Sequence, residues 1–144
     1  MFKHNPLGFH KHAMAAANAA ECANEQGKFW PMHDELFANN KKLGEADIQS
    51  YADKIGLNTK VFAACAKDKK YQFQIERDQK TAVSLGARGT PAFFVNGRYI
   101  SGARPVDDFS KLIDEELKKA KASGIPRADY YKKAIVAKGK KSLK

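Results

Sequence analysis

The sequence feature that most constrains the fold is the pair Asn96-Gly97, which sits inside the stretch "PAFFVNGRYIS" (91–101). Asn followed by Gly tolerates positive φ at both central positions of a tight turn, so the pair favours a two-residue hairpin connection. The runs on either side are rich in aromatic and β-branched residues, which are typical of strands. The sequence therefore predicts an antiparallel hairpin whose first strand starts at Pro91 and runs to Asn96.

Helical periodicity predicts a helical block before the hairpin and one helix after it. The predicted helices cover residues 10–26, 29–40, 44–57, 60–85 and 104–124. The charged middle of the 60–85 segment indicates either a helix exposed along one side or a break near Asp68. A short strand is expected at Met1–His4, and Pro6 marks its end because proline lacks a backbone N–H. This order of elements indicates an α/β arrangement.

The chain of 144 residues carries a formal net charge of +10, and its C-terminal end is especially rich in lysine. Residues 125–144 are expected to form a basic extension, solvated and partly frayed, with one short helix. The sequence has no zinc-finger or RNA-recognition signature, so no nucleic-acid partner is expected. No apolar run reaches about 18 residues, so no membrane span is expected. The N-terminus lacks the apolar core of a signal peptide, so the chain is either cytoplasmic or lacks its true N-terminus.

Two cysteines, Cys22 and Cys65, are the only thiols, and neither belongs to a C-x-x-C motif. Their residue pattern leaves two alternatives open: a structural disulfide that closes a long loop, or two buried free thiols that behave as small apolar side chains. The four histidines are scattered, so no metal site and no cofactor are predicted. They are expected at the surface or at helix starts: His4, His10, His12 and His33.

Apolar spacing also predicts which side chains form the core. Phe29, Trp30 and Phe37 are expected inside the helical block. The stripe along the last predicted helix includes one acidic residue among four apolar ones: Phe109, Leu112, Ile113, Glu116 and Leu117.

Two long stretches resemble the DsbA-like branch of the thioredoxin superfamily. They are "NPLGFHKHAMAAANAAECANEQGKFWPMHDELFAN" and "GARGTPAFFVNGRYISGARPVDDF", and together the similarity covers residues 2–117. The resemblance implies a thioredoxin-like fold, truncated at its N-terminus, with an inserted helical subdomain over about 10–86, an antiparallel hairpin and a C-terminal helix. The family domain would span 1–124, with 125–144 as an extension. The implied function is that of a domain of an extracytoplasmic (periplasmic or secreted) protein-disulfide oxidoreductase.

The resemblance also assigns roles to individual residues. Thr90 and Pro91 would form the cis-proline loop, which binds extended or unfolded protein substrates. The strand and the C-x-x-C helix that open the family domain have no counterpart in this chain, so the chain is expected to be inactive alone. The alternative is a redox-inactive, thioredoxin-like peptide-binding module. An extracytoplasmic family also favours a Cys22–Cys65 disulfide.

Without those opening elements, the hairpin and the N-terminal segment are expected to expose aromatic side chains, among Phe2, Phe93 and Phe94. An exposed apolar surface and an unpaired strand edge favour self-association. The alternative cover is the C-terminal extension itself, through its apolar residues Tyr130, Tyr131, Ile135 and Val136.

Overall fold

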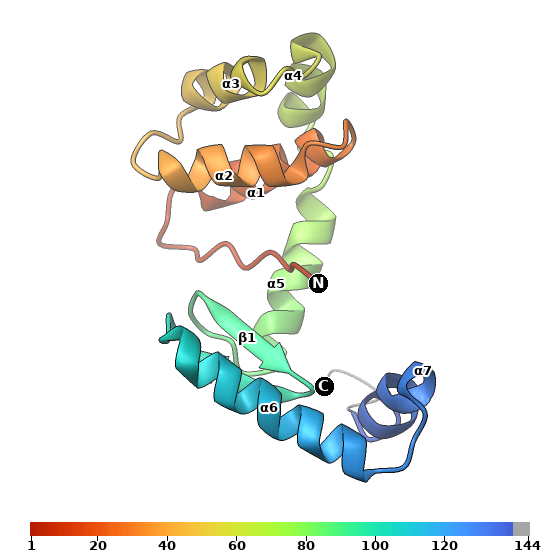
Figure 1. Ribbon diagram of the computed structural model, residues 1–144. Helices are drawn as coiled ribbons and strands as arrows, with labels where there is room; N and C mark the ends of the chain where they lie inside the picture. Colours follow the sequence, from red (N-terminus) through yellow and green to blue (C-terminus); the bar gives the residue numbers. More distant parts are fainter. Residues whose placement is uncertain (140–144) are drawn as a thin grey trace. The chain divides into compact units, whose positions relative to one another are not determined.

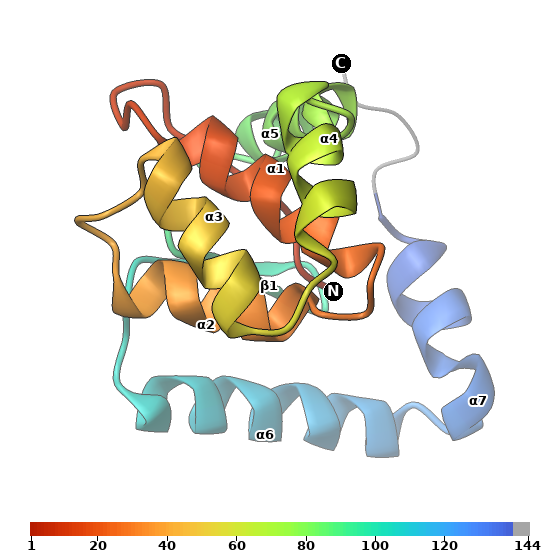
Figure 2. The same ribbon diagram turned by 90° about the horizontal axis from the view of Figure 1, so that it is seen from above.

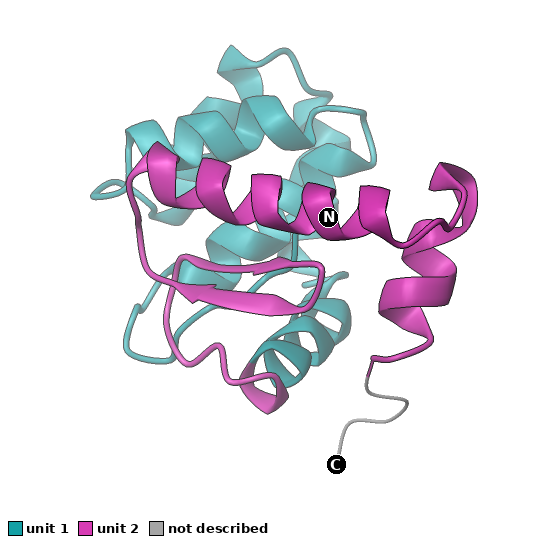
Figure 3. Cartoon of the chain, turned by 60° about the horizontal axis from the view of Figure 1, so that its bottom comes forward, with its two compact units in different colours: residues 1–82 teal, residues 83–144 magenta. Residues whose placement is uncertain are grey.

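The computed structural model describes residues 1–139, in which helices predominate and a single hairpin supplies the strands (Figure 1). In chain order the elements are α1 (Ala13–Asn24), α2 (Phe29–Ala38), α3 (Glu45–Lys54), α4 (Thr59–Lys67), α5 (Gln72–Ser84), β1 (Ala92–Val95), β2 (Arg98–Ser101), α6 (Val106–Ala122), α7 (Arg127–Tyr130) and the π-helix η1 (Tyr131–Val136). The chain divides into two compact units, Met1–Ala82 and Val83–Lys144 (Figure 3). We call them the helical unit and the hairpin unit.

Helix α1 is the centre of the helical unit. Its buried positions carry small side chains, such as Ala19 and Ala23, and small residues let neighbouring helices approach closely. Helices α2, α3 and α4 all pack against it (Figure 2). Larger apolar side chains from α2, α3, α4 and the turn before α4 fill the core of this unit: Met32, Leu36, Ile48, Tyr51, Leu57 and Phe62.

The long segment predicted over 60–85 is two helices, because α4 ends at Lys67 and α5 begins at Gln72. The break near Asp68 is thus confirmed. A buried asparagine of α1 bonds to backbone groups on both sides of the break. The Asn18 side chain accepts a hydrogen bond from the Tyr71 N–H (3.1 Å) and donates one to the Ala66 carbonyl (3.3 Å). This single side chain therefore bridges the ends of α4 and α5.

Of the two alternatives for the cysteines, the structure contains the disulfide. Cys22 of α1 and Cys65 of α4 are bonded, their Cα atoms are 5.8 Å apart, and both side chains are buried. The bond closes a loop with a sequence separation of 43 residues, which includes α2 and α3. It therefore ties α1 covalently to α4.

The predicted strand at Met1–His4 is wrong. This segment has no strand partner among the described residues, and side chains of α1 and α5 hold it in place instead. Lys3 forms an ion pair with Asp78 (2.6 Å), and the His4 ring contacts the Glu21 carboxylate (2.9 Å). His4 is only 5% exposed, so the expectation of a surface histidine fails there. A strand requires a ladder of backbone hydrogen bonds, and here contacts to the side chains of Glu21 and Asp78 take its place.

The hairpin unit confirms the prediction from Asn96-Gly97. Both residues have positive φ, 50° and 86°, and β1 pairs with β2 in antiparallel register with Val95 opposite Arg98. Helix α6 follows and packs against β1. In the described part of the chain no helix combines the length and apolar content that a membrane crossing requires.

We predict that removing the disulfide strongly destabilises the helical unit. Replacing Cys22 and Cys65 together by alanine should lower the free energy of unfolding by up to about 4 kcal/mol, the chain-entropy value for a loop of this length. Urea unfolding followed by far-UV circular dichroism measures the change. A reductant should destabilise the natural chain and leave the double variant unaffected. Equal midpoints for the two proteins under oxidising conditions would contradict the prediction.

Candidate functional site

The predicted site residues Thr90 and Pro91 lie in the loop between α5 and β1. Gly86, with φ of +91°, ends α5, and the chain then crosses five residues before the first strand begins. The Thr90–Pro91 peptide bond is cis, the form that the family resemblance implies. Both side chains are exposed, so the loop presents them to solvent.

One backbone hydrogen bond reveals which side of β1 is free. The Gly102 N–H donates to the Pro91 carbonyl (2.8 Å), so this pair is a hydrogen-bonded one. Hydrogen-bonded and non-hydrogen-bonded pairs alternate along an antiparallel ladder. The residues of β1 that bond to β2 are therefore Phe93 and Val95, and the N–H and C=O groups of Ala92 and Phe94 point away from β2.

The described sheet has two strands only, so these outward groups of β1 have no third strand to pair with. We call them, together with Thr90 and Pro91, the β1 edge. The Phe93 and Phe94 side chains are 39% and 42% exposed. The sequence-based expectation of exposed aromatic residues on the hairpin is thus confirmed. An edge of this kind can accept an extended peptide as an added strand.

Helix α6 supports the hairpin through an aromatic contact and through two ion pairs of Arg98. The Phe93 ring meets the edge of the Phe109 ring at a centroid distance of 4.8 Å. Arg98 of β2 contacts the Glu116 carboxylate (3.2 Å) and the Glu115 carboxylate (2.6 Å). The hairpin and α6 are thus joined at both strands, which fixes the orientation of the β1 edge on this helix.

Glu116 is the buried member of this contact, and it is 6% exposed. Lys119 lies 2.7 Å from its carboxylate and, with Arg98 and the side chain of Asn96, keeps the pKa of Glu116 below its ordinary value. The same carboxylates hold the pKa of Arg98 above its usual range, Glu115 contributing most. In the sequence Glu116 occupies a position of the apolar stripe. An acidic residue at such a position is the sequence signal of a buried ion pair.

The two cysteines lie outside this site. Both sulfur atoms are engaged in the disulfide of the helical unit, and the sequence contains no other cysteine. Thiol–disulfide exchange starts from a thiolate. The β1 edge therefore has no nucleophile supplied by the cysteines of this chain.

The structure does not gather the histidines at one place. His10 and His12 are exposed, and His33 contacts the Asp34 carboxylate at 3.0 Å. Among residues 1–139 no group of three or more His, Cys, Asp or Glu side chains could hold a metal ion.

A group of aromatic side chains expected in the core lies largely at the surface. Trp30 is 59% exposed and Phe37 is 66% exposed, so the prediction for these two is wrong; Phe29 is partly buried. Met32 and Leu36, four residues apart, occupy the inner face of α2. Trp30 precedes Met32 by two positions and so points to another side of the helix.

These exposed rings contact one another. Phe2 meets Phe29 and Trp30 edge to face at 5.2 and 6.1 Å. An open hollow of about 310 Å³ lies beside them, and its lining residues are Phe2, Glu21, Asn24, Gly27, Phe29 and Trp30. Its one ionisable side chain, Glu21, is already bonded to His4 and Asn24.

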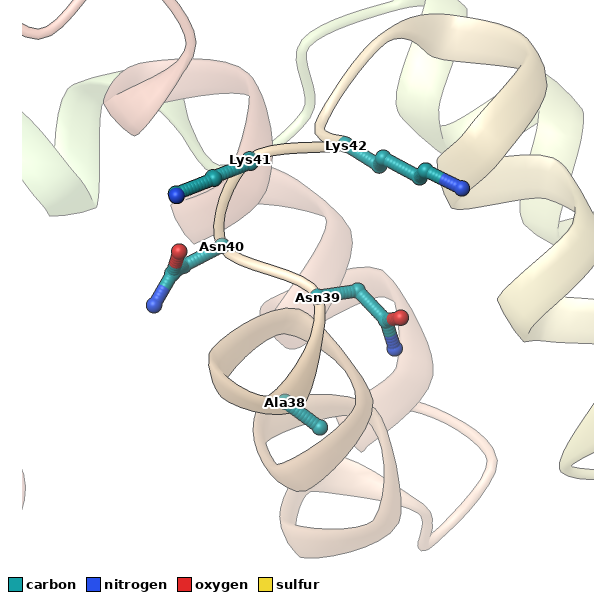
Figure 4. Close-up of a pocket in the computed structure, with 5 residues that line it drawn as sticks. All are labelled: Ala38, Asn39, Asn40, Lys41 and Lys42. Atoms are coloured by element: carbon teal, nitrogen blue, oxygen red, sulfur yellow. The ribbon is translucent and has the colours of Figure 1, made fainter.

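A second hollow of about 310 Å³ lies where α2 passes into the loop before α3. Figure 4 shows that Asn40 and Lys41 point to one side of the loop, whereas Asn39 and Lys42 point to the other. These side chains do not converge on a common point. Neither hollow contains the predicted site residues, so the β1 edge remains the candidate site.

The chain belongs to the DSBA-like thioredoxin domain family, which matches residues 2–114. The match includes nearly all of the helical unit and about half of the hairpin unit, with both strands and the Thr90–Pro91 loop inside it. It ends within α6, so residues 115–144 lie outside it.

Curated relatives are much longer proteins. The chain is 37% identical over 114 residues to Na(+)/H(+) antiporter NhaA 1 of Salinispora arenicola, and the alignment covers 78% of this chain and 18% of that protein. It is 38% identical over 114 residues to NhaA 3 of Salinispora tropica, with the same two coverages. For the antiporter NhaA of Herminiimonas arsenicoxydans, identity is 32% over 120 residues, covering 83% and 19%. The chain thus spans less than a fifth of the length of these relatives.

We predict that Glu116 makes the hairpin unit sensitive to acid. Because its folded-state pKa lies below the ordinary 4.5, the ionised carboxylate stabilises the fold above that value, and this contribution is lost as the pH falls through the lowered pKa. Glu116→Gln should lower the melting temperature near neutral pH, and the difference from the natural chain should shrink in acid. Glu115→Gln is the matched control, because that side chain is 59% exposed and contributes little. A difference that stays constant from neutral to acidic pH would contradict the assignment.

Proposed function

We propose that this chain is the substrate-binding part of a DsbA-like protein-disulfide oxidoreductase, which takes extended or unfolded protein chains as substrates. The observation that carries the proposal is the β1 edge. Its exposed Thr90 and Pro91 stand directly before two residues, Ala92 and Phe94, whose backbone groups face away from β2. Membership of the DSBA-like family supports the same assignment.

The β1 edge would bind substrate by strand addition. An extended peptide laid along β1 would exchange N–H···O=C bonds with Ala92 and Phe94, and Thr90 and Pro91 would contact it at one end. Backbone bonds of this kind provide affinity without reading the sequence, which suits an enzyme that acts on many unfolded chains. Contacts from Phe94 would add apolar affinity.

In thiol–disulfide exchange a thiolate attacks one sulfur of a substrate disulfide, a mixed disulfide forms and the other sulfur leaves as a thiolate. A second cysteine then attacks the mixed disulfide and releases the substrate in reduced form; oxidation of a substrate is the reverse sequence. The two cysteines of this chain are held together in the helical unit. The reactive dithiol of the proposed enzyme must therefore come from a C-x-x-C outside these 144 residues.

The absence of a C-x-x-C from the printed sequence favours a second candidate, a redox-inactive peptide-binding module that uses the same β1 edge. The coding sequence upstream of the Met1 codon distinguishes the two. An in-frame C-x-x-C, with disulfide exchange by the longer product, would establish the oxidoreductase. A longer product without this motif that still binds peptides would establish the binding module.

We place the protein outside the cytoplasm, in the periplasm or the medium. The bonded pair Cys22–Cys65 supports this proposal, because structural disulfides persist in oxidising compartments. Fractionation of cells followed by thiol labelling of the native protein tests it. Recovery in the cytoplasm with two free thiols would refute it.

The β1 edge can also be occupied by a second copy of the chain. Sedimentation equilibrium of the natural chain and of a variant without residues 125–144 tests this occupant. A dimer that forms in both proteins shows that the contact does not need the extension, whereas a dimer only in the shortened protein indicates that the extension covers the contact surface.

We predict that peptide binding depends on the outward N–H of Phe94. Phe94→Pro removes both this N–H and the aromatic ring, whereas Phe94→Ala removes the ring alone. Because the N–H is not used by β2, the hairpin should survive in both variants, and Phe94→Pro should bind a reduced, unfolded polypeptide far more weakly than Phe94→Ala. Isothermal titration calorimetry measures the affinities.

Tyr99→Pro is the matched control on the other strand, because Tyr99 pairs with Phe94 and its N–H points outward from β2. This variant should keep the affinity of the natural chain. Protection of the Gly102 amide from hydrogen exchange verifies that each hairpin is folded. Equal affinities for the proline and alanine variants at Phe94 would rule out strand addition along β1.

We also predict that the 144-residue chain alone does not reduce insulin in the presence of dithiothreitol faster than dithiothreitol does. Its two sulfur atoms lie in a buried disulfide of the helical unit, so no accessible dithiol is available. Insulin turbidity measures the rate. Turnover that disappears in the Cys22→Ala, Cys65→Ala double variant would show that this disulfide is itself reactive.

A further inference from the structure

We propose that the C-terminal extension binds the surface of anionic phospholipid membranes. The segment concerned is the helical run Arg127–Val136 together with Lys138, and we call it the basic arm. It lies outside the family match, which ends at residue 114. The proposal is independent of the function assigned to the β1 edge.

Charge is the first argument. Residues 125–144 hold seven of the 26 Lys and Arg residues of the chain and one of its 16 acidic residues. That acid, Asp129, is paired with Lys133 at 2.8 Å. Arg127, Lys132 and Lys138 are exposed, and no acidic side chain in the described part of the chain pairs with them. The basic arm therefore carries positive charge that is not neutralised locally.

The π-helical winding is the second argument. Residues 131–136 form a π-helix, and the Ala137 N–H bonds to the Lys132 carbonyl five residues earlier (3.1 Å). In a π-helix residues five apart lie nearly one above the other, whereas in a regular α-helix they point about 140° apart. The winding therefore aligns Tyr130 with Ile135 and Tyr131 with Val136.

The result is an apolar stripe along one side of the arm, with Lys132 and Lys133 on the remaining side. Tyr131 is 66% exposed and Val136 is 49% exposed, so much of the stripe is uncovered. Figures 1 and 2 agree that α7 leaves the end of α6 at an angle and forms a separate rod. Tyr130 and Ile135 are half-buried, so the exposed part of the stripe is formed mainly by Tyr131 and Val136.

An anionic lipid surface can bind both the positive charge and the apolar stripe of the basic arm. Its headgroups attract lysine and arginine, and its interfacial region accommodates tyrosine rings and short aliphatic side chains. Nucleic acid would use the charge but would leave Val136 and Ile135 in water. The combination of exposed apolar residues with unpaired lysines therefore favours lipid.

Vesicle co-sedimentation of the full chain tests the proposal. The chain should bind vesicles of phosphatidylcholine mixed with phosphatidylglycerol, should not bind pure phosphatidylcholine vesicles, and should bind less at high salt. Lys132→Gln with Lys138→Gln should weaken binding by about 25-fold, since each lysine near the surface contributes about fivefold. Lys111→Gln with Lys118→Gln, on α6, makes the same charge change and should have little effect.

A variant that preserves charge tests the apolar stripe. Tyr131→Ser with Val136→Ser should weaken vesicle binding by roughly tenfold, because apolar side chains no longer enter the interface. Circular dichroism and the Gly102 amide protection verify that the rest of the chain is folded.

Three results would overturn the proposal. The first is no binding to anionic vesicles at low salt, and the second is an equal loss in the two lysine pairs, which would indicate diffuse net charge. The third is unchanged vesicle binding by the serine variant together with equally tight binding of a single-stranded oligonucleotide, which would identify a general polyanion site.

Discussion

The turn at Asn96 and Gly97 sets the register of the hairpin, and the candidate site depends on that register. A slip of one residue would exchange the bonded and the outward positions of β1, so that Phe93 and Val95 would present their backbone groups in place of Ala92 and Phe94. The contact between Phe93 and Phe109 would be lost in the same step. Helix α6 also stabilises this register, because its buried Glu116 carboxylate forms an ion pair with Arg98, the first residue of β2 after the turn.

Features encoded by neighbouring residues could be predicted from the sequence. The hairpin follows from two residues that accept positive φ, and the end of α3 follows from Gly56, whose φ is +72°. The start of α4 follows from Asn58, whose side chain accepts the Val61 N–H. The charged run after Cys65 indicated a break as one alternative. The residue that bridges this break, Asn18, is 53 positions away from Tyr71, so no local pattern could identify it.

Features that depend on distant partners were the ones that sequence reasoning missed or left open. Met1–His4 has the composition of a strand, yet side-chain contacts to Glu21 and Asp78 hold it in the helical unit. Trp30 and Phe37 are apolar enough for a core, but the inner face of α2 belongs to Met32 and Leu36. The spacing of Cys22 and Cys65 was compatible with a disulfide bond and also with two free thiols. The role of Thr90 and Pro91 came from the family resemblance, since proline before a strand is also common at ordinary edges.

The boundary between Ala82 and Val83 has a consequence for how the chain is made. Every helix of the core around α1, both cysteines and the partners of His4 are encoded before that boundary. A chain that emerges from the ribosome N-terminus first can therefore complete the helical unit while the hairpin is still being synthesised. The order of synthesis thus places the helical unit before the open strand edge, which shortens the time during which that edge is exposed beside an unfolded neighbour.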